Sequence, residues 1–256
     1  FTHATLLPDQ ATILSQSEAL QDAVGQCAPR PTVSVGGGFT SARVTAKLAR
    51  VFRLRSIYGC TEVNVGVLFE ELDAPSTGGW FTLQGAREVE VVNELHEPCA
   101  ANEVGSLRIK LTELDAAGYL GDSVTTHAVF RAGYFYPGDT AIQRDDGRIR
   151  ILGRVADVLN LGGQKIAVAP IEANLQNLLQ VDYVCLFAGV NAAGEPEAVI
   201  AMETAEQPDQ ERLDHVGREF SQWGEVRFAL VDRFPRTQSG TSKIDRKRLR
   251  GLLFPD

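Results

Sequence analysis

The first part of the chain alternates short apolar runs with amphipathic stretches. Residues 32–36 form the run Thr-Val-Ser-Val-Gly, which predicts a short buried strand leading into three consecutive glycines. Apolar positions spaced for one helical face then predict a helix over about 41–52, with Thr40 or Ser41 as its N-cap. A second strand is expected over 55–58. This alternation of strand and helix is typical of α/β folds.

Residues 63–111 have a different pattern. Their apolar residues recur in short alternating runs, which predict antiparallel strands in a β-rich subregion. Such runs occupy 81–83, 89–92 and 105–109. Farther along, Asp145-Asp146-Gly147 separates two apolar runs and predicts a β-hairpin over 139–152.

After Arg154 the pattern changes once more. Helical spacing predicts a helix that begins at Pro170 and ends at Leu179. Strands are expected over 181–188, 197–203 and 226–231, with a second helix over 210–223. The predicted fold is therefore an α/β region with a β-rich part over 1–153, followed by a small α+β domain over 154–256.

The composition indicates a globular protein and excludes some classes of function. Hydrophobic residues make up 44% and charged residues 23% of the 256 positions, which is ordinary for a globular chain. The net charge of −8 argues against nonspecific nucleic-acid binding. Four well-separated cysteines without a CxxC pair predict reduced thiols in a cytoplasmic protein, and neither a signal peptide nor a membrane span is expected. Because the first residue is Phe1, we expect a processed chain or part of a longer one.

Five sequence motifs carry the chemical information. Each alone has an ordinary explanation: Tyr58-Gly59 suits the end of a strand, Asp139 suits the start of a hairpin, and Lys243 suits a solvated basic segment. Their order along the chain is the informative feature. In sequence they are Tyr58-Gly59-Cys60-Thr61-Glu62, Tyr119-Leu120-Gly121-Asp122, Gly133-Tyr134-Phe135-Tyr136-Pro137-Gly138-Asp139, the stretch 153–166 leading to Pro170-Ile171-Glu172, and the stretch 235–246 that contains Lys243.

In this order the motifs resemble the second half of the ANL superfamily, which comprises acyl- and aryl-CoA synthetases, peptide-synthetase adenylation domains and luciferases. The resemblance implies that 1–153 is the C-terminal part of the large nucleotide- and acyl-binding domain. It also implies that 154–256 is the small mobile domain with the catalytic lysine. The implied reaction activates a carboxylic acid with ATP and Mg²⁺, giving an acyl-adenylate and pyrophosphate. Transfer to a thiol of coenzyme A or of a carrier-protein phosphopantetheine is expected to follow.

The resemblance also implies a role for individual residues in nucleotide binding. Tyr58 would stack on adenine, Thr61 would donate its hydroxyl to the α-phosphate, and Glu62 would hold Mg²⁺. Asp139 would accept hydrogen bonds from the ribose hydroxyls, and Arg154 would bind ribose or phosphate with its fork of donors. Backbone at Gly36, Gly37, Gly38 and Gly59 would lie against the nucleotide.

The remaining implied roles belong to the small domain. Lys243 would bridge the substrate carboxylate and the α-phosphate. Gly162, Gly163 and Lys165 would belong to the loop that meets the thiol acceptor. Ala156 and Asp157 would form the hinge.

The chain departs from the family pattern in four places. The family's phosphate-binding loop is not found in these 256 residues, and Thr241 and Ser242 lengthen the loop before Lys243. Ala156 stands at the hinge position, and Pro170 replaces an acidic residue. The missing phosphate-binding loop and the lengthened loop before Lys243 favour an alternative, a degenerate protein that binds a nucleotide or a partner without turnover. The joint presence of Tyr58, Thr61, Glu62, Asp139, Arg154 and Lys243 favours the enzyme.

Overall fold

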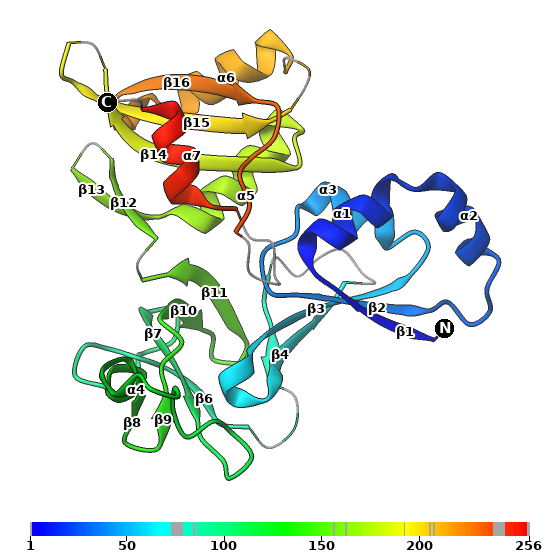
Figure 1. The fold of residues 1–256 in the computed structure, drawn as a ribbon, viewed down its shortest axis with the longest axis vertical. Coiled ribbons are helices and arrows are strands. Elements are labelled where there is room, and N and C mark those ends of the chain that lie inside the picture. Colours follow the sequence, from blue (N-terminus) through cyan, green and yellow to red (C-terminus); the bar gives the residue numbers. More distant parts are fainter. Residues whose placement is uncertain are drawn as a thin grey trace. The chain divides into compact units, whose positions relative to one another are not determined.

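The chain folds into two compact units that each mix helices and strands (Figure 1). The computed structural model describes residues 2–72, 79–83, 85, 87–155, 157–161, 163–191, 193–204, 206, 208–237 and 244–254. Unit 1 comprises Phe1–Thr40 with Thr45–Ala156, and unit 2 comprises Ser41–Val44 with Asp157–Asp256. No helix within the described ranges combines the length and the apolar character needed to cross a bilayer.

The first sheet of unit 1 has five strands in the order of the sequence. They are β1 (His3–Leu6), β2 (Thr32–Gly36), β3 (Arg53–Cys60), β4 (Val65–Glu71) and β5 (Thr82–Leu83). The first three strands are parallel, and β4 and β5 join antiparallel. Helices α1 (Pro8–Gln16), α2 (Glu18–Gly25) and α3 (Ala42–Leu48) lie along one side of this sheet (Figure 1). The predicted strand over 32–36 is confirmed.

Helix α3 is shorter than predicted. Ser41 does cap it, since its Oγ accepts the backbone N–H of Val44 at 3.3 Å. The helix ends at Leu48, and the next residues form a turn in which the N–H groups of Val51 and Phe52 both donate to the carbonyl oxygen of Leu48. Phe52 is then buried in the core, and β3 begins at the next residue. The apolar spacing through Phe52 therefore reflects a buried turn and not continued helix.

The second sheet of unit 1 is antiparallel and follows the predicted β-rich pattern. Its strands run in the order β11-β10-β7-β9-β8, with β6 paired to β7. They are β6 (Val89–Val92), β7 (Val104–Lys110), β8 (Phe130–Arg131), β9 (Tyr134–Phe135), β10 (Asp139–Gln143) and β11 (Ile149–Arg154), with α4 (Ser123–Val129) before β8. The predicted hairpin over 139–152 is confirmed as β10 and β11.

One hydrophobic core joins the two sheets of unit 1. Residues of β4 and the preceding turn pack in the same buried cluster as residues from β6, β7, β10 and β11. Members that are at most 2% exposed include Val63, Val67, Leu68, Val91, Leu107, Ile109, Ala141 and Ile149. This shared core fixes the second sheet against the first, and so holds β10 near the end of β3.

Unit 2 is a three-stranded sheet with helices on both faces. A hairpin of β12 (Val158–Leu161) and β13 (Gln164–Ala167) precedes α5 (Val168–Leu179). Strands β14 (Tyr183–Val190), β15 (Pro196–Glu203) and β16 (Glu225–Val231) form the sheet, with β15 between the other two. Helices α5 and α6 (Gln210–Phe220) share one core with one face of the sheet. Helix α7 (Arg246–Leu253) packs through Leu249 on the other face (Figure 1).

Helix α5 begins earlier than the sequence predicted. Its first residue is Val168, so Pro170 lies inside the first turn and does not start the helix. The N–H groups of the first turn have no intrahelical acceptor, and a proline there sacrifices no helical hydrogen bond. Leu175 and Leu179 form the buried face of the helix.

Candidate active site

The glycine loop follows β2 and the Tyr58 motif ends β3, so both lie at the carboxyl ends of neighbouring strands of the first sheet. Strands β2 and β3 are parallel, and Gly36 lies opposite Ile57. A Cβ atom on Gly36 would lie 3.1 Å from the carbonyl oxygen of Ile57, and Gly37 has a φ of +87°. Both observations explain the need for glycine here. Ligands of α/β sheets bind outside the carboxyl ends of the strands, so this edge is the expected location of a nucleotide.

A β-bulge lies within the Tyr58 motif. The pairing of β3 with β4 shifts register between Tyr58 and Gly59, so that Tyr58 lies opposite Leu68 and Gly59 opposite Gly66. Bulges commonly redirect a strand beside an active site. Directly after the strand, Thr61–Val63 form a single 3₁₀ turn, η1, which carries two of the predicted site residues.

Asp139 contacts both Tyr58 and Arg154, although the sequence separates Tyr58 widely from the other two. Asp139 and Arg154 are directly opposite in the β10–β11 pair. Arg154 Nε lies 3.0 Å from Asp139 Oδ1, and the Tyr58 hydroxyl donates a hydrogen bond to Asp139 Oδ2. The Asp139 side chain is 8% exposed, whereas that of Arg154 is 52% exposed. A buried carboxylate thus holds a guanidinium that still faces solvent.

The hydroxyl of Tyr58 stays protonated in this arrangement. Burial and the neighbouring charge of Asp139 together raise the pKa of Tyr58 well above its usual range. At neutral pH the phenol is therefore a hydrogen-bond donor, which suits its contact with a carboxylate. Arg154 is held by a second contact, because its Nη1 donates to the carbonyl oxygen of Pro137 at 2.6 Å.

Glu62 on the η1 turn is an ionised carboxylate. Its Oε1 accepts the hydroxyl of Tyr119 at 2.7 Å. Burial acts against ionisation, but this hydrogen bond and others outweigh it and lower the pKa of Glu62. The thiol of Cys60 stays neutral, since burial first and the charge of Glu62 second raise its pKa to about 12. Thr61 is exposed on the same turn.

The donor set around Glu62 suits Mg²⁺ held jointly with phosphate oxygens. Mg²⁺ usually binds to one or two carboxylates together with waters and substrate phosphates. Glu62 provides one such oxygen donor, and the lowered pKa keeps it charged. Within the described ranges no group of three or more His, Cys, Asp or Glu side chains could enclose a metal by itself. An ion at Glu62 would therefore depend on the nucleotide for its other ligands.

Three residues near η1 were not assigned a role from the sequence. Tyr119 belongs to the motif Tyr119-Leu120-Gly121-Asp122, and only its position in that motif could have indicated a role. Arg87 and Asp115 form a bidentate ion pair beside the same turn, and Arg87 Nη2 donates to the carbonyl oxygen of Val63 at 2.9 Å. No motif marked this pair, because it depends on which strands are neighbours.

In unit 2 the structure describes only part of the predicted thiol-acceptor loop and hinge. Gly163 lies in the β12–β13 turn with a φ of +83°, and Lys165 is an exposed residue of β13 opposite Asn160. The carbonyl oxygen of Asp157 accepts the N–H of Val168 at 3.3 Å. Ala156 and Gly162 lie outside the described residues.

Lys243, Thr241 and Ser242 also lie outside the described residues, but both flanks of their segment are described. Arg236 and Ile244 form an antiparallel bridge. The N–H of Asp245 donates to the carbonyl oxygen of Pro235 at 2.8 Å. The Asp245 side chain then caps α7 by accepting the N–H of Arg248 at 3.0 Å.

Two motifs of unit 2 meet in a partly buried ion pair between Glu172 and Arg246. Arg246 Nη1 lies 2.9 Å from Glu172 Oε1, and the same oxygen accepts the N–H of Leu186 at 2.6 Å. Arg246 Nη2 donates to the carbonyl oxygen of Leu186 at 2.9 Å. Burial raises the pKa of Glu172, and the charge of Arg246 opposes that rise. The pair fixes the start of α7, three residues after Lys243.

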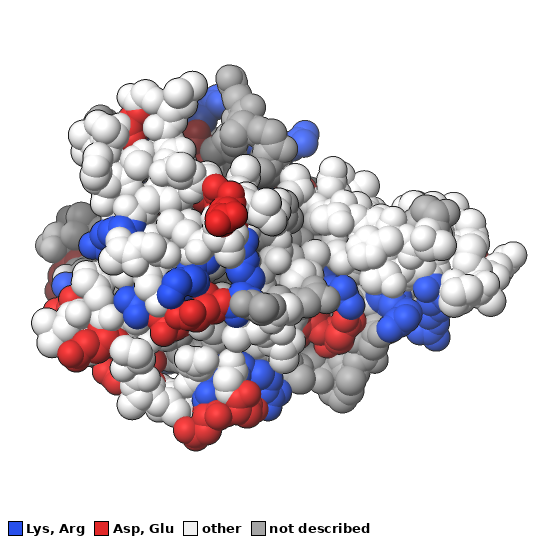
Figure 2. All heavy atoms as spheres, turned by 90° about the horizontal axis from the view of Figure 1, so that it is seen from below, with Lys and Arg blue, Asp and Glu red and all other residues white. Residues whose placement is uncertain are grey.

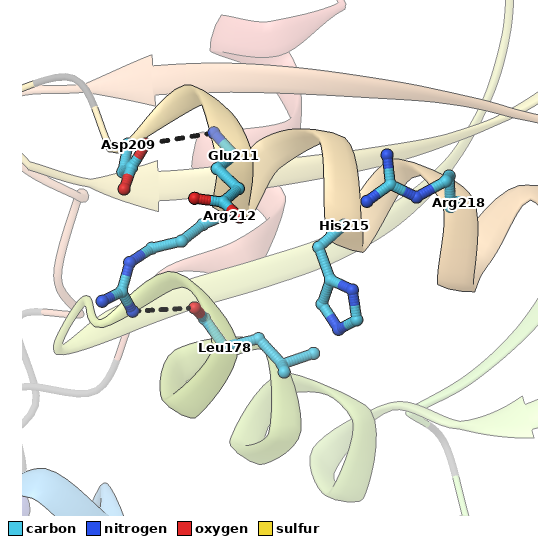
Figure 3. Close-up of a pocket in the computed structure, with 6 residues that line it drawn as sticks. All are labelled: Leu178, Asp209, Glu211, Arg212, His215 and Arg218. Atoms are coloured by element: carbon cyan, nitrogen blue, oxygen red, sulfur yellow. Dashed lines mark hydrogen bonds between the residues drawn. The ribbon is translucent and has the colours of Figure 1, made fainter.

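The pocket of unit 2 contains none of the predicted site residues. A shallow pocket of about 320 Å³ lies between α5 and α6 and is lined by Leu178, Asp209, Glu211, Arg212, His215 and Arg218 (Figure 3). Arg212 spans it by donating to the carbonyl oxygen of Leu178 at 3.2 Å. On the face drawn in Figure 2, basic and acidic side chains are interspersed.

No model of a known protein family matches the sequence. Individual proteins do match. The chain is 27% identical over 237 residues to pseudomonine synthase PmsE of Pseudomonas entomophila, covering 86% of this chain and 37% of that protein. It is 25% identical over 229 residues to the vibriobactin-specific 2,3-dihydroxybenzoate-AMP ligase of Vibrio cholerae, covering 85% of this chain and 41% of the ligase. The chain thus spans about two fifths of the length of these relatives.

Solved structures give the same result for the fold. The amide bond synthetase McbA of Marinactinospora thermotolerans has a TM-score of 0.80 and 19% identity, covering 99% of this chain and 53% of that one. The O-succinylbenzoate coenzyme A synthetase of Bacillus subtilis, in complex with ATP and a magnesium ion, has a TM-score of 0.76 and 18% identity, covering 97% and 51%. The predicted resemblance to the ANL superfamily of adenylate-forming enzymes is confirmed, and the chain has the fold of about half of each of these solved structures.

Proposed function

We propose that this chain provides nucleotide-binding and catalytic residues for ATP-dependent activation of a carboxylic acid. The products of this step are an acyl-adenylate and pyrophosphate. The observation that carries the proposal is the contact of Tyr58, Asp139 and Arg154. It is supported by the place of Tyr58 at the carboxyl edge of the parallel strands, three residues before the η1 turn.

The three joined residues suit the nucleoside part of the ligand. The hydroxyl of Tyr58 is tied to Asp139, so the ring is held in one orientation, and we assign its flat face to the adenine base. Asp139 accepts ribose hydroxyls through its carboxylate oxygens, each of which has more than one acceptor site. The half-exposed guanidinium of Arg154 binds ribose or phosphate oxygen.

We assign the binding of the reacting α-phosphate to Thr61, Glu62 and Lys243. Glu62 would hold Mg²⁺, which would supply charge neutralisation on the phosphate oxygens. Thr61 donates its hydroxyl to the α-phosphate. Lys243 carries a positive charge at neutral pH and bridges the α-phosphate and the attacking carboxylate. This chemistry needs positioned charge and no covalent bond to the protein.

Transfer of the acyl group from the adenylate to a thiol is proposed as the second step: a thioester bond forms, the acyl–phosphate bond breaks, and AMP leaves. The acceptor is coenzyme A or the phosphopantetheine of a carrier protein, and Gly162, Gly163 and Lys165 belong to the loop that meets it. Rotation about Ala156 and Asp157 would bring this loop to the adenylate. The division of the compact units between these two residues supports a hinge at this point.

The proposal is tested by mixing the 256-residue chain with ATP, Mg²⁺ and a panel of carboxylic acids. The panel includes 2,3-dihydroxybenzoate, the acid in the name of one relative. Pyrophosphate release and hydroxamate formation with hydroxylamine are measured for each acid, together with the thermal shift caused by ATP. We expect both products with at least one acid. A thermal shift with no product from any acid would favour the non-catalytic binding protein. If neither a thermal shift nor a product is observed, both the enzyme and the binding protein are refuted.

A further inference from the structure

A buried ion pair supports the turn that carries Thr61 and Glu62. Arg87 donates two hydrogen bonds to the Asp115 carboxylate, at 2.5 and 2.6 Å. The Arg87 side chain is 18% exposed and that of Asp115 is 0% exposed. The same guanidinium donates to the carbonyl oxygen of Val63, the last residue of η1, at 2.9 Å. One side chain therefore joins the turn to the segment around Asp115.

The η1 turn depends on contacts from outside itself. It has only three residues, and the N–H of Asn64 reaches the carbonyl oxygen of Thr61 at 3.3 Å. Short 3₁₀ turns have poor hydrogen-bond geometry and little stability of their own. The residues after Asp115 supply the remaining support, because Ala116 N–H donates to the Glu62 carbonyl oxygen at 2.9 Å and Tyr119 binds the Glu62 carboxylate.

The Asp115 segment is in turn fixed to the second sheet. Asp115 Oδ2 accepts both the N–H and the hydroxyl of Thr112, at 2.6 and 2.8 Å. Arg87 precedes β6, and its Nη1 donates to the carbonyl oxygen of Lys110 at the end of β7, at 3.2 Å. Strands β6 and β7 are hydrogen-bonded neighbours. A continuous set of contacts therefore leads from the second sheet through Arg87 to the carboxylate of Glu62.

We propose that Arg87 and Asp115 are positioning residues that hold Thr61 and Glu62 in place for a magnesium-bound nucleotide. This inference rests on the proposed function. Arginine suits the task because its planar fork reaches a carboxylate and backbone oxygens at once, whereas the single ammonium of lysine lacks that fork. Residues that support a metal ligand typically change metal affinity by about 10- to 100-fold when they are mutated.

The test compares Arg87, which lies just before β6, with Arg108 on the neighbouring strand β7. Arg87→Lys keeps the charge and removes the fork. Arg108→Lys is the matched control, because Arg108 pairs with Glu90 across β6 and β7 and contacts no part of η1 in the described residues. Calorimetry measures the Kd for AMP without metal and for ATP with Mg²⁺. We expect Arg87→Lys to weaken Mg·ATP binding about 10-fold and AMP binding less than about twofold, with neither changed by Arg108→Lys.

Hydrogen exchange tests the same inference without any nucleotide. Arg87→Lys should speed exchange at the amide of Ala116, and Arg108→Lys should not. Asp115→Asn, which preserves the shape of the side chain, is the second variant if Arg87→Lys does not fold. Equal loss of both ligands, no loss of either, or unchanged exchange at Ala116 would overturn the positioning role. Failure of the wild-type chain to bind either nucleotide would instead count against the proposed function.

Discussion

Loss of the Tyr58 hydroxyl is expected to destabilise unit 1 more than loss of the Arg154 guanidinium. The hydroxyl donates to Asp139, whose side chain is 8% exposed, so Tyr58→Phe removes a donor from a buried carboxylate. A hydrogen bond to a charged group contributes about 1.5–3 kcal/mol, so we expect a loss of about 2 kcal/mol in the free energy of unfolding. Arg154→Ala removes the other partner of Asp139, but the place of the 52% exposed guanidinium is open to water, which solvates Asp139 Oδ1 instead, so the cost should be smaller, about 1 kcal/mol.

The two tryptophans allow each unit to be followed separately. Trp80 lies in unit 1 and Trp223 in unit 2. In a Trp223→Phe background, fluorescence during urea unfolding therefore reports unit 1 alone. The variants Tyr58→Phe and Arg154→Ala are compared in that background, with a further comparison in which Asp139→Asn is also present.

Dependence on Asp139 is the decisive feature of this experiment. When Asp139→Asn removes the charge, the cost of Tyr58→Phe should fall to about 1 kcal/mol, the value of a neutral hydrogen bond. An unchanged cost in that background would show that the hydroxyl acts through another partner. A cost for Arg154→Ala that exceeds that of Tyr58→Phe would also refute the reasoning.

Two further predictions concern other buried charges. Glu172→Ala leaves the partly buried guanidinium of Arg246 without its carboxylate and should lower the stability of unit 2 by about 1–3 kcal/mol. Trp223 fluorescence in a Trp80→Phe background measures this loss, and a loss below about 1 kcal/mol would contradict the account. The hydrogen bonds from Arg87 lower the pKa of Asp115 to about 2. Because the unfolded pKa is higher, this carboxylate stabilises the fold above about pH 4, and about 2 kcal/mol is lost as the pH falls toward 2. Asp115→Asn should remove that part of the acid dependence, and an unchanged acid profile would argue against the pair.

Local patterns in the sequence predicted most of the strands correctly. The run 32–36 and the hairpin over 139–152 were correct because period-2 alternation and a strong turn signal act over neighbouring residues. The helix predicted to end near Phe52 was too long, since a buried turn has the same apolar spacing as a helical face. Pro170 was taken as a helix start, although the first turn tolerates proline at several positions.

Sequence motifs predicted some of the candidate site residues. They did not predict the residues whose contacts depend on strand register. The order of motifs predicts that Tyr58, Asp139 and Arg154 share one candidate site, and in the structure Asp139 contacts both of the others. Arg87 and Asp115 have no such signal. Their pairing depends on β6 and β7 being neighbours and on the core that joins the two sheets, which no local pattern specifies.

Removal of the Lys243 amine is the most direct test of the proposed activity. The acid that gives most pyrophosphate is used to compare Lys243→Ala with Lys247→Ala, which removes an exposed lysine of α7. We predict that Lys243→Ala lowers the rate of pyrophosphate release by about 10²–10³, while the Kd for ATP with Mg²⁺ changes less than about threefold. Lys247→Ala should change neither quantity. Equal loss of rate and of ATP affinity in Lys243→Ala, or a rate equal to that of the wild type, would contradict the account.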